Sequence, residues 1–210
     1  MDEMKKLDHI VYCTPDLYQG IQLIEGLTGV QPRIGGRHLT KGTHNALLPI
    51  GPFCYLEILA PDPANWDIGS PRWMGIDLLE RPCISRWSIR TDQLASRFQE
   101  FREIIPSLGV IEEGTRKLND GTTLKWSLTD PGVRPAISTI PFLIDWENSP
   151  HPASDLELKC QISEITLHQS NDVLPESVLN DLDIPVKQAH SDWPCISIQL
   201  DTPNGVVRLT

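Results

Sequence analysis

The chain has 210 residues, with 28 acidic and 18 basic side chains and a formal net charge of −10. This acidic balance argues against nonspecific nucleic-acid binding, because neutralising phosphates requires clustered lysine and arginine. No long apolar run and no apolar N-terminal signal core is present, so we expect neither a membrane partner nor a secretory leader. The cysteines are odd in number and widely spaced: Cys13, Cys54, Cys83, Cys160 and Cys195. They predict free thiols in a cytoplasmic globular protein, which leaves two classes open, a small-molecule enzyme or a small-molecule binding protein.

The first part of the chain predicts one strand, one helix and three further strands. β-Branched and aromatic residues over 7–14 indicate the first strand. Asp16 stands at the N-cap of a segment with apolar residues at helical spacing, and Gly29 ends that helix. Glycine-containing turns then separate three short extended segments, at residues 37–40, 44–50 and 54–59.

The same order of elements repeats after an apolar connector over residues 65–82. A strand at 84–90 is followed by a helix capped by Thr91 and Asp92. Three strands complete this second unit, at residues 110–113, 122–128 and 136–146. The two copies form a weak internal repeat of about 80 residues.

The residues after 152 predict a third, shorter copy of the same pattern. Its expected elements are a strand at 160–169, a helix at 175–182 and strands at 186–189, 195–200 and 206–209. We therefore expect an α+β fold with βαβββ modules at 7–63 and 83–147. These form a paired domain over 1–152, and a βαβββ-like unit over 153–210 packs on it.

Several segments of the chain resemble those of a known superfamily. The first strand opens with Leu7-Asp8-His9-Ile10-Val11, and Gly35-Gly36-Arg37-His38, the run 42–48 and the run 55–62 follow it. The second unit ends in the run 141–146, with His151-Pro152 after it. In this order they are similar to the vicinal oxygen chelate (glyoxalase, bleomycin-resistance and dioxygenase) superfamily and, more narrowly, to the glyoxalase-like domain family. The resemblance covers residues 7–152.

The resemblance implies that each βαβββ unit curls into a half-barrel and that the pair encloses a cavity. Relatives often hold a divalent metal there, which acts as a Lewis acid on substrate oxygens. His9 and Glu57 occupy the corresponding strands and would hold one ion of Zn, Ni, Mn, Fe or Co. A buried carboxylate is costly unless it is paired or bound to a metal, so Glu57 draws attention within its apolar strand. The alternatives are a hydrogen-bonded interior histidine at His9, and at Glu57 an outward-facing side chain or an ion pair with an arginine.

The second unit departs from the metal-binding pattern. Arg86 aligns with His9 and cannot ligate a metal, and the last strand of the unit offers only Asp145. A metal would then depend on His9, Glu57, water and His44. If Glu57 is not a ligand, it becomes a candidate general base, with His44 as a proton shuttle.

Other side chains suggest how an anionic ligand is recognised. Arg86 is a bidentate partner for a carboxylate or a phosphate, and Arg37 and His38 could add to the same positive pole. Trp126 and Trp146 would supply an apolar wall, with ordinary core packing as the alternative interpretation. His151 and His168 are interpreted as linker and surface residues.

These features predict a metal-dependent, glyoxalase-like enzyme of lyase, isomerase or dioxygenase type, acting on a small, oxygenated, anionic molecule. The alternative is a metal-free protein of the same fold that binds or sequesters a small molecule. A pure interaction module is a third interpretation, supported only by the extra C-terminal unit. A homodimer is the one oligomer we consider.

Overall fold

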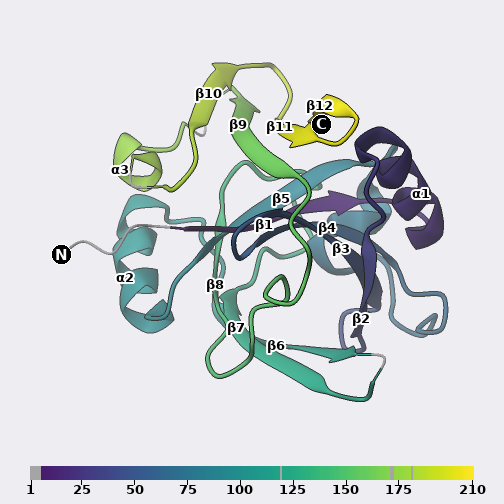
Figure 1. Cartoon of the computed structure of the whole chain (residues 1–210). Helices are drawn as coiled ribbons and strands as arrows, with labels where there is room; N and C mark the ends of the chain where they lie inside the picture. Colours follow the sequence, from purple (N-terminus) through teal and green to yellow (C-terminus); the bar gives the residue numbers. More distant parts are fainter. Residues whose placement is uncertain (1–5, 119, 171–172, 181) are drawn as a thin grey trace.

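The computed structural model describes residues 6–118, 120–170, 173–180 and 182–210. Its strands form a closed barrel in the order β1-β4-β3-β2-β6-β7-β8-β5, with a separate four-stranded sheet beside it (Figure 1). Among the described residues, no helix has the length and apolar character needed to cross a membrane. The α+β architecture expected from the sequence is confirmed.

The first half of the barrel follows the expected order closely. It contains β1 (Lys6–Cys13), α1 (Leu17–Thr28), β2 (Arg33–His38), β3 (Thr43–Gly51) and β4 (Cys54–Pro61). The Asp16 side chain accepts the backbone amide of Gln19 in the first turn of α1, and Gly29 ends the helix with a left-handed φ of 74°. β1 pairs in parallel with β4, and the remaining strands are antiparallel, which produces one βαβββ half-barrel.

The second half contains η1 (Trp73–Leu78), β5 (Cys83–Arg90), α2 (Leu94–Ile104), β6 (Ile111–Leu118), β7 (Thr123–Thr129) and β8 (Phe142–Asp145). The expected strand over 136–146 is shortened to β8, because the loop before it contains prolines that cannot donate to a sheet. β6 runs beyond its expected end and pairs along its length with β7. Gln93, not Asp92, is the N-cap of α2, and the hydroxyl of Thr91 accepts the Gln93 amide.

Two strand pairs close the barrel. β1 pairs antiparallel with β5, and β2 pairs antiparallel with β6. The β1–β5 register is irregular between Leu7 and His9 and again between Val11 and Tyr12. Such β-bulges turn side chains to a different face of the strand than simple alternation predicts. The first irregularity decides where Asp8 points.

The third unit contains β9 (Gln161–Gln169), α3 (Glu176–Leu179), β10 (Val186–His190), β11 (Cys195–Thr202) and β12 (Gly205–Leu209). Its βαβββ order is as expected, but its pairing differs from that of the first two units. β9 lies between β10 and β11, whereas β1 pairs with the last strand of its own unit. In Figure 1 this sheet, coloured green to yellow, lies across one side of the barrel.

Two apolar cores hold these layers together. The outer core joins the barrel to α1, α2 and the third unit, and Ile10 and Ile165 both belong to it. The inner core fills the barrel with large side chains, including Tyr55, Trp126 and Trp146. A polar group inside the barrel is therefore surrounded by apolar side chains, several of them aromatic.

Candidate functional site

His9 lies inside the barrel with its ring held on several sides. Its Nδ1 is 2.6 Å from Asp8 Oδ1 and 2.9 Å from the hydroxyl of Ser88. The ring stacks on Tyr55, with centroids 4.8 Å apart and planes within 10° of parallel. Its other nitrogen, Nε2, is 3.7 Å from Glu57 Oε2. The two residues singled out from the sequence thus face each other, and both line one small cavity.

Glu57 is held from its opposite oxygen. Asn45 Nδ2 donates to Glu57 Oε1 at 2.5 Å, while Asn45 Oδ1 accepts the backbone amide of Gly36 at 2.9 Å. The second bond fixes which way the Asn45 amide points, because only its oxygen can accept. Glu57 Oε2 is left to face His9.

Asp8 connects His9 to two further donors. Strand alternation predicts that Asp8 faces away from His9, and this is wrong, because the bulge in β1 brings its carboxylate to the same side. Asp8 Oδ2 lies 3.0 Å from Trp146 Nε1 and 3.2 Å from His151 Nε2. Burial raises the pKa of Asp8, but hydrogen bonds from His151 and His9 more than offset this and leave the pKa well below its usual range. Asp8 is therefore an ionised carboxylate.

His151 lies against Asp8, a position that its place between two prolines in the sequence does not indicate. Its Nδ1 accepts the backbone amide of Ala153 at 3.2 Å, so its Nε2 carries the proton donated to Asp8. The prolines on either side of His151 hide this role in the sequence, because only the fold brings residue 151 to β1.

The hydrogen bonds around His9 define where a proton can move. An ionised Asp8 only accepts, so His9 Nδ1 carries a proton and Nε2 presents its lone pair or a second proton to Glu57. The 3.7 Å between Nε2 and Oε2 exceeds hydrogen-bond length. When Nε2 presents its lone pair, both Nε2 and Glu57 Oε2 are acceptors, and a proton, a water molecule or a cation must lie between them. The pair is therefore suited to hold and release a proton.

The cavity beside this pair is nearly filled. Its volume is about 10 Å³, which is room for roughly one water molecule. Trp126 fits against it because β6 carries Gly114, where a Cβ would lie 2.2 Å from the indole Nε1. The lining residues are His9, His38, Tyr55, Glu57, Trp73, Arg116, Trp126, Leu128, Phe142, Ile144 and Trp146.

Arg116 is a lining residue that the sequence did not indicate. The side chain projects from β6 and the residue is only 3% exposed. Its side chain has no hydrogen-bonded partner among the described residues, and its Nε is buried without one. Burial lowers the pKa of Arg116, and the nearby Tyr55 and Glu57 act in the opposite direction. The expected strand ended at residue 113, so no face of the sheet could be assigned to residue 116.

His38, Trp126 and Trp146 also line this cavity, as their expected ligand-binding role requires. His38 Nδ1 is 3.0 Å from the hydroxyl of Thr43, and its ring meets Trp73 and Trp126 edge-on. Burial lowers the pKa of His38 to about 3. A neutral His38 does not provide the positive pole expected of it.

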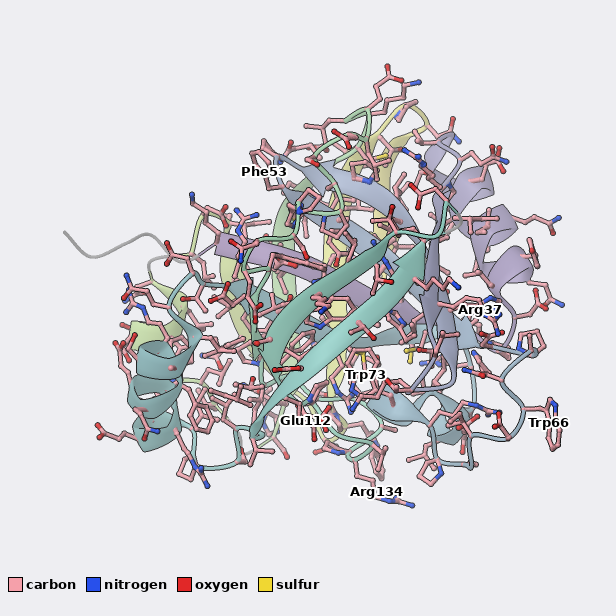
Figure 2. All side chains as sticks on the ribbon, turned by 90° about the horizontal axis from the view of Figure 1, so that it is seen from below. Arg37, Phe53, Trp66, Trp73, Glu112 and Arg134 are labelled. Carbon is pink, nitrogen blue, oxygen red and sulfur yellow. The ribbon has the colours of Figure 1, made fainter. Side chains whose placement is uncertain are left out.

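The structure does not bring Arg37 or His44 to the cavity. Arg37 Nε donates to Asp62 Oδ2 at 2.5 Å, and its side chain is 41% exposed at the edge of the barrel (Figure 2). His44 lies on β3 opposite Arg37 of β2. Because His44 and Asn45 are consecutive residues of one strand, their side chains point to opposite faces of the sheet. Burial lowers the pKa of this half-buried histidine, but Glu57 is not among its neighbours.

Arg86 also lies apart from Glu57. It is opposite Val11 on β1, whereas Ser88 is opposite His9, so the residue aligned with His9 lies farther along the barrel. Its guanidinium donates to the carbonyls of Ser85, Pro135 and Ala136 at 2.6–2.9 Å. Burial lowers the pKa of Arg86 to about 10.

Arg86 lines a different cavity, of about 420 Å³, beside the loop that precedes β8. Arg134, also in that lining, is exposed and extends away from the body of the protein (Figure 2). The described residues show no ion pair between Arg86 and Glu57 within 4.0 Å. Arg86 instead anchors the proline-rich loop through its carbonyl groups.

The side chains at the His9–Glu57 cavity do not fit a resident divalent metal. The described residues contain no group of three or more histidine, cysteine, aspartate or glutamate side chains able to hold such an ion. Asp145, the other acid considered, lines a separate pocket with Lys6 and Arg90. The cavity already contains the Arg116 cation, which repels a second positive charge. Two protein ligands beside a buried guanidinium make a poor metal site.

The neutral state of buried His38 gives a pH prediction. Its pKa is about 3 in the fold and near 6.5 when exposed, so below pH 6.5 the unfolded chain binds a proton that the folded chain does not. The free energy of unfolding should therefore fall by up to about 1.4 kcal/mol per unit as the pH drops from 6.5 toward 3. Urea unfolding at pH 7 and 4.5 should show a smaller fall for His38→Asn. The exposed His190→Asn variant should match the parent; equal falls in all three proteins would contradict the prediction.

Comparisons with known proteins agree with this architecture. The family model described as "Glyoxalase-like domain" matches residues 7–181, which extends the resemblance beyond residue 152 into the third unit. A hypothetical protein from Staphylococcus aureus is similar in structure, with a TM-score of 0.67, 14% identity and coverage of 98% of this chain and 99% of that chain. At that identity it shows a shared fold alone.

Weaker structural likenesses include two methylmalonyl-CoA epimerases. A variant from Streptomyces coelicolor in complex with 2-nitronate-propionyl-CoA has a TM-score of 0.48 and 15% identity, over 68% of this chain and 95% of that chain. The enzyme from Mycobacterium tuberculosis has a TM-score of 0.42 and 15% identity, over 69% and 88%. Neither carries weight for function at these scores. No protein of curated function matches the sequence. From the family match over most of its length and the paired βαβββ barrel, the chain belongs to the glyoxalase-like domain family.

Proposed function

We propose that this protein is an enzyme that transfers a proton on a small oxygenated molecule, with Glu57 as the base and His9 as its proton partner. The observation that supports this most is the approach of Glu57 Oε2 to His9 Nε2 at 3.7 Å inside an apolar barrel. Each group is fixed from its far end, Glu57 by Asn45 and His9 by Asp8. A base held in place by its neighbours is what proton abstraction needs.

The proposed step begins at a carbon next to a carbonyl group. Glu57 takes a proton from that carbon, and the electron pair of the broken C–H bond moves onto the carbonyl oxygen to form an enolate. Return of the proton to the other face gives an isomerase, and loss of a leaving group from the adjacent carbon gives a lyase. Through one water molecule between the two groups, His9 Nε2 can take the proton from Glu57, because the ionised Asp8 stabilises the imidazolium that results. No metal ion is required.

The test is exchange of substrate hydrogen with deuterated water. Wild-type protein would be incubated with pyruvate, 2-oxobutyrate or mandelate in D2O, and the loss of the C–H signal followed by NMR. We expect Glu57→Gln to slow exchange by about 10²–10⁴-fold, because the amide keeps the Asn45 contact but cannot accept the proton. Glu112→Gln is the matched control, since Glu112 pairs with Lys41 away from His9. Equal rates for Glu57→Gln and wild type would contradict the proposal.

A metal-free binding protein is the second candidate. The cavity walled by Trp73, Trp126 and Trp146 is nearly filled by side chains. A ligand can therefore be held at the opening of the barrel without a reaction taking place inside it, which favours this candidate. Binding of these acids without hydrogen exchange would support this candidate over the enzyme.

A further inference from the structure

We propose that Arg116 binds the carboxylate of a small monocarboxylate ligand, which reaches it through the pocket between β6, β7 and the segment 150–156. The inference names the substrate class of the proposed function and rests on it for the position of Glu57. It begins from a buried guanidinium that has Glu57 nearby but no hydrogen-bonded partner among the described residues.

The isolation of Arg116 distinguishes it from the other arginines near the barrel. Arg86, equally buried, donates to three carbonyl oxygens, and Arg37 has Asp62 as its partner. Arg116 is 3% exposed, and no hydrogen bond joins its guanidinium to any of the described residues. A buried cation whose N–H donors have no acceptor destabilises the folded state, because it has lost its hydration. An anion that binds the cation offsets that loss of free energy.

Arg116 lies between two spaces. On one side it lines the small cavity that contains Glu57 and His9. On the other it lines a pocket of about 300 Å³ beside Leu47, Leu124 and His151. That volume falls within the usual range for small-molecule sites. A molecule in the outer pocket that contacts Arg116 is thereby held next to the cavity of the proposed base.

The lining of the outer pocket indicates the kind of anion. A guanidinium offers parallel N–H donors that match a carboxylate. The remaining walls are largely apolar, with Ile34, Leu47, Leu118, Leu124 and Leu156 among them. Asp120 and Asp155 are exposed members of the same lining. The exposed Arg33 also lines this pocket, so the two carboxylates outnumber the one further cation. They repel a dianion more than a monoanion, so the pocket suits a monocarboxylate with a short apolar part better than a phosphate ester.

Binding can be followed by tryptophan fluorescence, because Trp73, Trp126 and Trp146 line the cavity shared with Arg116. The probes are lactate and pyruvate, with lactamide as the uncharged match of lactate and inorganic phosphate as the alternative anion. We expect lactate or pyruvate to bind in preference to lactamide and phosphate. Arg116→Gln should weaken carboxylate binding by about 30-fold or more. Arg208→Gln replaces an exposed arginine on β12 that lies outside this lining, and it should leave carboxylate binding within a few-fold of wild type.

Thermal stability separates a ligand-binding role from a structural one. If Arg116 is unpartnered until an anion binds, Arg116→Met should melt at a higher temperature than wild type in carboxylate-free buffer. It should also lose the rise in Tm that lactate or pyruvate causes in wild type. A structural arginine would give a lower Tm on replacement. A lower Tm together with an unchanged carboxylate effect would overturn the proposal.

Failure of the Arg116 anion site can be distinguished from failure of the proposed enzyme activity. Glu57→Gln should still bind the carboxylates while losing hydrogen exchange. If Arg116→Gln loses binding but wild type exchanges no hydrogen, the anion site stands and the enzyme proposal fails. If wild type binds neither lactate nor pyruvate better than lactamide, the anion site is wrong whatever the exchange rate.

Discussion

Removal of residues 153–210 is expected to give a product that aggregates instead of folding. β9 and β11 contribute apolar side chains to the same core as the barrel and its helices, and each is at most 6% exposed: Ile162, Ile165, Leu167, Ile196, Ile198 and Leu200. Their burial stabilises the fold by on the order of 10 kcal/mol before conformational entropy is counted. The truncated chain would expose the barrel face that they cover. Circular dichroism and size-exclusion chromatography of the 1–152 product measure this.

A substitution in the full-length protein separates the effect of losing a core contact from the effect of removing residues 153–210. Ile165 is fully buried between the sheet and the barrel, so Ile165→Ala should lower the free energy of unfolding by about 2–5 kcal/mol while the protein remains folded. A soluble 1–152 fragment that melts cooperatively would show instead that the paired units form an independent domain.

Replacement of Asp8 by asparagine should have the second large effect. The Asp8 carboxylate accepts from His9, Trp146 and His151, and an asparagine can accept at one atom only. Its amide nitrogen would face a donor, so we expect a loss of about 3–5 kcal/mol in the free energy of unfolding. Hydrogen exchange should fall as well, because His9 would lose the group that fixes its Nδ1 proton. Urea unfolding and the D2O assay measure the two effects.

Asp16→Asn is the control for the change of charge. Asp16 caps α1 on the surface, and asparagine caps helices nearly as well, so stability should change by less than about 1 kcal/mol. Exchange should be unchanged. If Asp8→Asn unfolds at the same urea concentration as wild type, Asp8 is not the shared acceptor that its contacts indicate.

Local sequence signals predicted most of the fold. Strands with β-branched residues and the Asp16 and Gly29 helix ends were found where expected, because those signals act within a few residues. β6 was underestimated, since its polar residues and Gly114 hide the alternation that its pairing with β7 imposes. The strand pairing of the third unit could not be predicted either, because the same order of elements along the chain is compatible with more than one order of strands in the sheet.

The site was predictable only in part, and the reason lies in β-bulges and long-range contacts. His9 and Glu57 stood out because polar groups within apolar strands require partners. Strict alternation would place Asp8 on the face opposite His9, and the bulge that breaks this alternation in β1 gives no signal in the sequence. Arg116 was missed because its strand was not expected to extend so far. The internal repeat aligned Arg86 with His9 and so predicted that both side chains enter one cavity. In the structure β1 and β5 pair antiparallel, and Ser88, not Arg86, lies opposite His9.

The most direct test of the central account is hydrogen exchange by protein stripped of metal. Wild-type protein treated with a chelator and Glu57→Gln would be compared in D2O with the carboxylate that binds best. The account predicts that stripped wild type retains its exchange rate, that added Zn²⁺, Ni²⁺ or Mn²⁺ does not raise it, and that Glu57→Gln is slower by at least about 10²-fold. Loss of exchange on stripping, restored by one of these ions, would contradict a metal-independent base at Glu57.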